Sequence, residues 1–472
     1  MFQPDEEIVK KIDQWIGDNR DAFVRDLGRL VAVPSISRKE EGEYPFGEDC
    51  ARVLDEAAAV AAQYGFTVEN HEYYCGSLLV KGASDQARRM GLFAHLDVVP
   101  LGEDWQYPPL ACTLKDGYLI GRGVGDNKGP GVCGLYALRF LKEQGIRLEH
   151  DVVLYLGLAE ETGMKDIDYF CRTQRVPDFA LVTDTNFPVC YGEKGLMRAR
   201  VRCRSQGNLA WFRAGSVVNV IPSRAEALVR GISLKDARKR MEGKVRIAVS
   251  EAPEGVRFTA AGTSRHAAFP EGSVNAIHVL AEALASSGLL TGSSQEAVKA
   301  LEVLTGDHYG HGAGIPFEDP ESGKLTCIGS VAGMERGELS LSFDIRYPVT
   351  VRGEAVEAAF RRRVESLGFQ YEPGELSAPA YVPLDHPYIP LLTGICDYVQ
   401  GKHYEPYTMG GGTYSRHLPA AIGFGPGVPD APNPFGDGHG QGHQPDECVP
   451  LDMLLKGIKT YILALMELDR IL

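Results

Sequence analysis

The chain has 472 residues, which is too long for one ordinary hydrophobic core and predicts two or three domains. Its hydrophobic content of 44% and charged content of 24% are typical of a soluble globular protein. The formal net charge of −14 argues against nucleic acid and anionic membranes as partners, because both bind basic surfaces.

The N-terminal segment and the cysteines lead us to expect a cytoplasmic protein. Residues 1–7 are acidic, whereas a secretory signal would be basic and then apolar. No apolar stretch approaches the roughly 20 residues that a membrane-spanning helix needs. The ten cysteines contain no Cys-x-x-Cys pair and several lie in apolar runs, so we expect buried free thiols.

Up to about residue 190, predicted strands alternate with predicted helices. Apolar residues at helical spacing predict a helix over 6–32, which Pro34 ends. The other elements expected here are helices over 51–64 and 131–143, strands over 90–94, 151–158 and 180–183, and a hairpin over 113–120. This alternation predicts an α/β fold, with a mainly parallel sheet sandwiched by helices.

The pattern changes in the middle of the chain. From residue 195 to about 380, mixed apolar and polar strands surround two long helical stretches, over 274–287 and 353–367. This pattern indicates a separate α+β domain.

The first pattern then returns, with a strand over 420–424 and a final helix over 451–472. We therefore expect the middle to be an insertion. The predicted domains are a catalytic domain built from 1–192 and 384–472, and an inserted lid domain over 193–383.

Histidine and acidic residues follow the strand-like runs of the first domain. His95 and Asp97 lie two residues apart after the apolar run 90–93, so their side chains point the same way. That spacing suits a metal ligand and the carboxylate that fixes its ring. The residues that follow are Asp126 in a glycine-rich loop, the doublet Glu160-Glu161, Asp184 and His443. Ligands gather at strand ends of this kind in open α/β sheets.

This set has the chemistry of a site for two divalent cations. Two ions about 3.5–4 Å apart need a bridging carboxylate, with roughly one more carboxylate and one imidazole for each ion. One glutamate of the doublet would remain free to take a proton from water. Taken singly, each residue fits a loop-capping or surface role, and only the ordered set favours a metal site. The spacing does not choose between His439 and His443 as the last ligand.

Three residues of the middle region have the chemistry of substrate-binding groups. Asn219 and His266 can donate hydrogen bonds to a developing oxyanion, and Arg346 can form a fork with a carboxylate. The run Gly410-Gly411-Gly412-Thr413 can bind an anion through backbone amides or form a flexible turn. Considered without the rest of the chain, each of these residues is more readily explained by a structural role.

Three motifs occur in an order that resembles the co-catalytic zinc peptidase family, which includes aminoacylases, carboxypeptidase G and bacterial dipeptidases. They are His-Leu-Asp-Val-Val-Pro at 95–100, Gly-Arg-Gly-Val-Gly-Asp-Asn-Lys-Gly at 121–129 and Glu-Glu-Thr-Gly-Met-Lys at 160–165. Segments 164–169 and 410–416 are most similar to the dipeptidase V branch. The resemblance extends from about residue 30 to the end of the chain.

The resemblance implies a set of five metal ligands. One ion would be held by His95 and Asp184, the other by Glu161 and His443, and Asp126 would bridge the two. His443 is preferred because the family's ligand precedes a segment like 444–447. Zinc is the expected metal, with manganese or cobalt as alternatives.

The resemblance also implies the catalytic and substrate-binding residues. Asp97 would orient His95, and Glu160 would act as the general base. In the lid, His266 and Asn219 resemble the pair that stabilises the oxyanion. Arg346 resembles the residue that grips the substrate's free carboxylate, helped by the backbone near Gly412.

The implied function is hydrolysis of unblocked dipeptides by a metal-dependent enzyme that we expect to be a monomer. The alternatives are an amidohydrolase that deacylates N-acyl amino acids or N-acyl diamino acids, and a non-catalytic member of the fold. Loss of a ligand or of the base would signal the non-catalytic case, and all of them are present. Residues 295–325 match nothing in this resemblance, so the preferred dipeptide stays open.

Overall fold

The computed structural model describes residues 2–472, and the chain folds into two compact units. The first unit contains residues up to Gly192, Ala380–Tyr407 and Gly412–Leu472. The second contains Glu193–Pro379 together with the short segment Thr408–Gly411. The return to the first unit therefore begins at Ala380, four residues before the position expected from the sequence. The assignment of the second unit as a lid stays a prediction.

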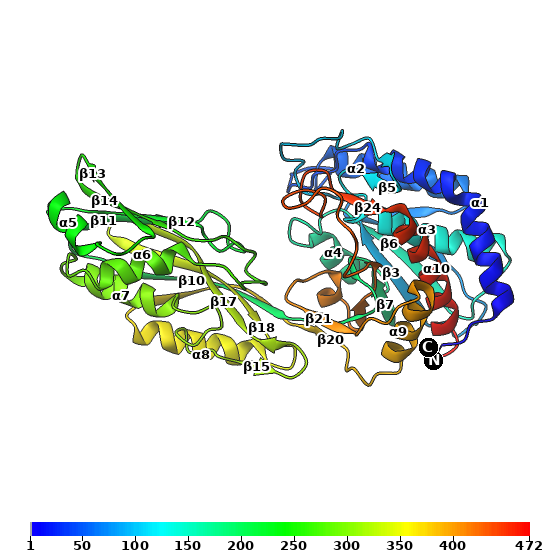
Figure 1. Ribbon diagram of the computed structural model, residues 1–472. Coiled ribbons are helices and arrows are strands. Elements are labelled where there is room, and N and C mark those ends of the chain that lie inside the picture. Colours follow the sequence, from blue (N-terminus) through cyan, green and yellow to red (C-terminus); the bar gives the residue numbers. More distant parts are fainter. Residues whose placement is uncertain (1) are drawn as a thin grey trace. The chain divides into compact units, whose positions relative to one another are not determined.

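A nine-stranded mixed sheet organises the first unit (Figure 1). Its strands are β1 (Val68–His71), β2 (Cys75–Val80), β3 (Arg89–His95), β6 (Asp151–Gly157), β7 (Phe179–Val182), β9 (Cys190–Glu193), β20 (Ala380–Tyr381), β21 (Tyr407–Met409) and β22 (Ala421–Gly423). The central ladders, in the order β6-β3-β7-β22, are parallel. The β1/β2, β2/β6 and β22/β9 ladders are antiparallel, so the sheet is mixed.

Helices cover both faces of this sheet, as expected for the α/β class. They are α1 (Glu6–Val31), α2 (Glu48–Gln63), α3 (Lys128–Glu143), α4 (Lys165–Thr173), α9 (Tyr388–Gln400), α10 (Leu451–Leu468) and the 3-10 helix η1 (Tyr414–His417). Alternate strand residues face opposite sides. Leu92 and Leu154 pack with α1, α2, α3, α9 and α10, whereas Phe93 and Tyr155 pack with α4 and η1. All seven residues of β6 are buried.

Two small sheets complete the first unit. The three-stranded sheet contains the expected hairpin, as β4 (Thr113–Lys115) and β5 (Tyr118–Ile120), together with β24 (Cys448–Pro450). The two-stranded sheet pairs β8 (Thr185–Asn186) with β23 (Pro426–Gly427). The β24/β5 ladder places residues just before Cys448 beside the glycine-rich loop that follows β5.

The second unit is built on an eight-stranded sheet in which every ladder is antiparallel. In spatial order its strands are β13 (Ile247–Ala252), β14 (Gly255–Ala261), β12 (Arg224–Val229), β11 (Leu209–Ala214), β17 (Thr326–Glu335), β18 (Glu338–Tyr347), β10 (Gly195–Arg204) and β19 (Gln370–Ser377). A short hairpin joins β15 (Glu318–Asp319) and β16 (Gly323–Lys324). This is the α+β pattern expected from the sequence.

The second unit has two more helices than the sequence analysis expected. Among the described residues, its helices are α5 (Leu234–Arg240), α6 (Ala276–Ala285), α7 (Ser293–Leu304) and α8 (Gly353–Ser366). The expected helices correspond to α6 and α8. The seven-residue α5 is too short for a clear period, and α7 falls largely in the segment that the sequence analysis left unassigned. The second core includes Ala297, Val298 and Leu301 of α7.

Candidate metal centre

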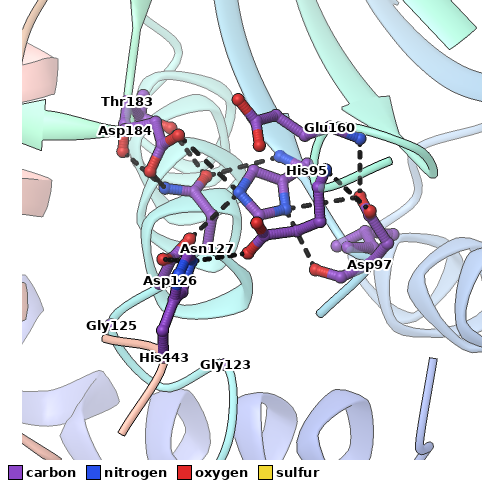
Figure 2. Close-up of polar contacts among 12 residues, drawn as sticks. His95, Asp97, Gly123, Gly125, Asp126, Asn127, Glu160, Thr183, Asp184 and His443 are labelled. Carbon is purple, nitrogen blue, oxygen red and sulfur yellow. Dashed lines mark hydrogen bonds and ion pairs between the residues drawn. The ribbon is translucent and has the colours of Figure 1, made fainter. Parts of the chain in front are cut away.

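The carboxyl ends of three neighbouring parallel strands bring the predicted ligands of the first unit together. His95 is the last residue of β3, Glu160 and Glu161 follow β6, and Asp184 lies two residues beyond β7. Because β6, β3 and β7 are parallel neighbours, their ends meet at one edge of the sheet. Figure 2 shows His95, Glu160 and Asp184 pointing toward this common region.

Asp126 lies between the two predicted histidine ligands (Figure 2). Its Oδ1 is 3.1 Å from His95 Nε2, and its Oδ2 is 3.1 Å from His443 Nε2. Each histidine also approaches a second carboxylate. His95 Nε2 is 3.7 Å from Asp184 Oδ2, and His443 Nε2 is 3.0 Å from Glu161 Oε1. The contacts therefore form two groups that share Asp126.

The donor set fits divalent cations. His95, Asp126 and Asp184 offer ligand atoms within 4.8 Å of one another, and so do Asp126, Glu161 and His443. Each group supplies one imidazole and two carboxylates, and the two oxygens of Asp126 serve one group each. This is the composition of a site for zinc or a similar borderline cation. His95 also forms a third group with Glu160 and Glu161.

The pKa values in this cluster show competition between burial and charge. Burial raises the pKa of Asp184 to about 7 and the pKa of Glu160 well above its usual range. Hydrogen bonds to Asp126 and Glu161 raise the pKa of His443 to about 11. Burial also acts to raise the pKa of Asp126, but hydrogen bonds from His443 and His95 outweigh it and lower that pKa. Several carboxylates thus compete for few positive charges, as expected where cations bind.

Asp97 organises more than the ring of His95. Its backbone oxygen is 3.0 Å from His95 Nδ1, and its Oδ1 is 3.4 Å from the same nitrogen. The Asp97 carboxylate also accepts the backbone N–H of Glu160 and of Glu161, each at 3.1 Å. Ser37 Oγ donates a further hydrogen bond to it over 2.7 Å. The carboxylate therefore holds the turn that carries the glutamate doublet.

Glu447 anchors the loop that carries Asp126, a role that the sequence analysis missed. This fully enclosed carboxylate accepts the backbone N–H of Gly123, Gly125 and Asp126 at 3.0–3.1 Å. It also accepts a hydrogen bond from the buried guanidinium of Arg122 at 2.8 Å. The only signal in the sequence was that Glu447 follows His443 closely in an acidic segment.

Two polar side chains near the centre lie outside the donor groups. Asn127 Nδ2 donates to Asp184 Oδ1 over 3.1 Å and to the Thr183 backbone oxygen over 2.8 Å. His439, the alternative to His443, instead places Nδ1 2.8 Å from Asp446 Oδ2. The sequence could not choose between the two histidines by spacing, whereas only His443 lies beside Asp126 and Glu161 among the described residues.

The predicted substrate-binding residues His266 and Asn219 lie on paired segments of the second unit. Ala267 N donates to the Asn219 backbone oxygen over 2.9 Å, and His266 pairs with Val220 in an isolated bridge. Ala267 and Ile221, which lie on these segments, pack against Ile328 of β17. The two residues therefore lie on neighbouring paired segments, one step apart in register.

Arg346 lies on the face of β18 opposite the apolar core and is held tightly. Asp344 accepts hydrogen bonds from Arg346 Nε at 2.7 Å and from Nη2 at 3.2 Å. Nη1 donates to the Gly410 backbone oxygen over 2.7 Å. An arginine has five N–H donors, so two are left after these three bonds. At Gly412 a Cβ atom would lie 2.3 Å from Arg416 Cζ, so a side chain there would have to displace the guanidinium of Arg416.

Comparison with known proteins identifies the family. The model of peptidase family M20/M25/M40 matches residues 91–467, which is most of the chain. This chain belongs to that family. It is therefore a peptide-bond hydrolase, and the resemblance drawn from the three sequence motifs is confirmed.

Its relatives include dipeptidases. The chain is 28% identical to the putative dipeptidase YtjP of Bacillus subtilis strain 168 over 481 residues, covering 98% of this chain and 99% of that protein. It is also 28% identical to the Beta-Ala-Xaa dipeptidase of Lactobacillus delbrueckii subsp. lactis over 474 residues, covering 96% of this chain and 97% of that protein.

Solved structures show the same fold at lower identity. Human carnosine dipeptidase 1 is 16% identical with a TM-score of 0.57, and the match covers 99% of this chain and 100% of that one. Aminoacylhistidine dipeptidase from Vibrio alginolyticus is 14% identical with a TM-score of 0.57, covering 94% and 96%. Within the described part of this chain, none of the helices has the length and apolar character needed to cross a membrane.

Proposed function

We propose that this peptidase is a metal-dependent dipeptidase that hydrolyses unblocked dipeptides. The observation that carries the proposal is Asp126, whose two carboxylate oxygens face His95 and His443 at 3.1 Å each. The dipeptidase relative from Lactobacillus delbrueckii, which matches nearly the whole chain, supports the same substrate class.

The proposed cofactors are two divalent cations, with zinc expected first and manganese or cobalt as alternatives. His95 and Asp184 would hold one ion, Glu161 and His443 would hold the other, and Asp126 would bridge them. Bound cations of this kind lower the pKa of water toward about 7 and polarise a carbonyl group.

Glu160 is the proposed general base. The two backbone hydrogen bonds that Asp97 accepts fix the turn on which it lies. Burial raises the pKa of Glu160 well above its usual range, so this carboxylate is a stronger base than an exposed glutamate. Glu160 would take the proton of the attacking water and then deliver it to the amine nitrogen of the leaving residue.

The second unit would supply the substrate-binding groups. His266 and Asn219 would donate hydrogen bonds to the oxyanion that develops on the scissile carbonyl. Arg346 keeps two N–H donors beyond its bonds to Asp344 and Gly410, and these would bind the free carboxylate of the dipeptide. The backbone near Gly412, which belongs to the first unit, is a further group proposed to bind the substrate.

The test is a matched substrate panel on purified protein. Unblocked dipeptides and N-acetyl amino acids would be compared with Zn²⁺, Mn²⁺ or Co²⁺ added, and with a chelator. Cleavage of unblocked dipeptides that the chelator abolishes is the expected result. Cleavage of only the acylated compounds would replace the proposal with a deacylase that uses the same centre. Lack of cleavage in every metal would favour a non-catalytic member of the fold.

Two further expectations belong to the same proposal. The protein is expected to be a monomer, which light scattering of the metal-loaded chain would check, because a mass of twice the 51.4 kDa chain would contradict it. The cytoplasmic location stays a prediction.

A further inference from the structure

We infer that Asp166 and Tyr414 form a positioning pair that fixes the backbone carrying Glu160. The inference rests on the proposed role of Glu160 as the general base. Neither residue was singled out by the sequence analysis for such a role, and neither belongs to the donor groups of the metal centre. Asp166 is 0% exposed and Tyr414 is 1% exposed.

Four consecutive backbone N–H groups, those of residues 158–161, donate to two buried aspartates. Leu158 N and Ala159 N donate to Asp166 Oδ2 over 2.8 and 2.9 Å. The next two, on Glu160 and Glu161, donate to Asp97. Side-chain carboxylates thus hold the whole segment between the end of β6 and the glutamate doublet.

Tyr414 fixes the second of these carboxylates. Its hydroxyl donates to Asp166 Oδ2, the same oxygen that accepts the N–H of Leu158 and Ala159. The other oxygen, Oδ1, accepts the N–H of Ile167 at 2.8 Å in the first turn of α4. Asp166 is therefore saturated with donors, and a rotation of its carboxylate would break several hydrogen bonds together.

The end of β6 is shaped to admit this pair. A Cβ atom at Gly157 would lie 1.9 Å from the Tyr414 hydroxyl oxygen and 2.5 Å from Asp166 Oδ2. The absence of a side chain at Gly157 therefore lets both groups approach the backbone. The Tyr414 ring also meets the ring of Tyr155 on β6 edge-on, with centroids 5.3 Å apart. This arrangement ties η1 to the strand that precedes the catalytic doublet.

Loss of the Tyr414 hydroxyl should lower the catalytic rate, because proton transfer requires Glu160 to be placed accurately. A misplacement of 1 Å in a catalytic group can lower the rate by about 100-fold. Without the Tyr414 hydroxyl, Asp166 Oδ2 loses one of its three donors, so one of the two anchors of the turn before Glu160 is held less firmly. Metal binding should persist, because none of the five proposed ligands forms a side-chain hydrogen bond with Tyr414 or Asp166 in the described part of the chain.

The test compares Tyr414→Phe with a matched control, Tyr136→Phe. Tyr136 is likewise buried, and its hydroxyl donates to the buried Asp26 over 2.8 Å in the same unit. Each substitution therefore removes one hydroxyl from a buried Tyr–Asp pair. Steady-state kinetics on an unblocked dipeptide, metal content per chain and thermal unfolding would be measured for both variants and the wild type.

We expect Tyr414→Phe to lower kcat about tenfold or more, with KM within about twofold and metal content unchanged. Tyr136→Phe should leave kcat unchanged even if its melting temperature falls. Unchanged kcat in Tyr414→Phe, equal kcat losses in both variants, or a kcat loss that tracks lost metal would each overturn the inference. A wild-type protein inactive on all dipeptides would instead contradict the proposed function.

Asp166→Asn provides a second, independent variant. The asparagine keeps an oxygen for some of the donors but loses the charge that strengthens their hydrogen bonds. Like Tyr414→Phe, Asp166→Asn should lower kcat while its KM stays close to that of the wild type. A variant that is folded and metal-loaded with the kcat of the wild type would overturn the inference, whatever Tyr414→Phe shows.

Discussion

At the scale of single residues, adjacent glutamates should respond differently to the same substitution. Glu161 Oε1 lies 3.0 Å from His443 in a donor group that includes Asp126, whereas Glu160 is the proposed base. Glu160→Gln should lower kcat by roughly 10²–10⁴-fold with metal content intact, as expected when a general base is lost. Glu161→Gln should lose bound metal. Kinetics and metal analysis would check both, and a Glu160→Gln variant with near-normal kcat would contradict the assignment.

The raised pKa values of His443 and His95 predict that metal binding depends on pH. In the metal-free protein, hydrogen bonds to Asp126 and Glu161 raise the pKa of His443 to about 11, so this ring is protonated at pH 7. Burial acts to lower the pKa of His95, but Asp126 and Asp97 more than offset it and the pKa is raised. A histidine must lose its proton to bind metal. Loading Zn²⁺ should therefore release protons, and the affinity should increase with pH.

Calorimetry in buffers of different ionisation enthalpy would measure this proton release between pH 6 and 8. The metal-free protein is titrated with Zn²⁺ at each pH, and the number of protons is obtained from the buffer dependence of the heat. Substitution of His439, which pairs with Asp446 outside the donor groups, provides the control and should leave the proton count unchanged. Binding without proton release would contradict the assigned ligands.

At the scale of elements, the loop that carries Asp126 depends on one distant carboxylate. Glu447→Ala would leave the buried guanidinium of Arg122 without its charged partner and three backbone N–H groups without this acceptor. Removing one partner of a buried ion pair typically costs about 3–5 kcal/mol. Urea unfolding of the metal-free protein should show a loss of that order.

The exposed pair of Arg230 and Glu254 provides a matched control for this experiment. Both side chains are more than half exposed, so Glu254→Ala should change the unfolding free energy by less than about 1 kcal/mol. If Glu447→Ala and Glu254→Ala destabilise the protein equally, the anchoring role of Glu447 is wrong. A loss confined to Glu447→Ala supports it.

The elements around the candidate site differ in how far they could be predicted from the sequence. The buried strands β3, β6 and β7 were predictable because their continuous apolar runs end in acidic residues or histidine. The antiparallel outer strand β1 was not, because it is short and largely polar. The anchoring role of Glu447 could not be predicted from its position after His443, since its partners are backbone groups and a guanidinium 321–325 residues away. The proposed ligand set came from motif order and stays a prediction, whereas the hydrogen bonds around these residues could not be predicted from the sequence.

At the scale of the whole molecule, the two units carry different parts of the proposed chemistry. All five proposed metal ligands belong to the first unit, and Arg346 belongs to the second. A change at Arg346 should therefore affect substrate binding without affecting metal content. Lysine is the informative replacement, because it keeps the positive charge near Asp344 but loses the planar fork that binds a carboxylate.

Arg346→Lys should raise KM for unblocked dipeptides by roughly 10–100-fold, because a hydrogen bond to a charged group contributes about 1.5–3 kcal/mol. The same dipeptides with an amidated C-terminus lack the carboxylate, so their already higher KM should change little between wild type and variant. This comparison separates loss of the carboxylate contact from general damage to the second unit. If both substrate series lose affinity equally, Arg346 acts through the structure around Asp344 and does not grip the carboxylate.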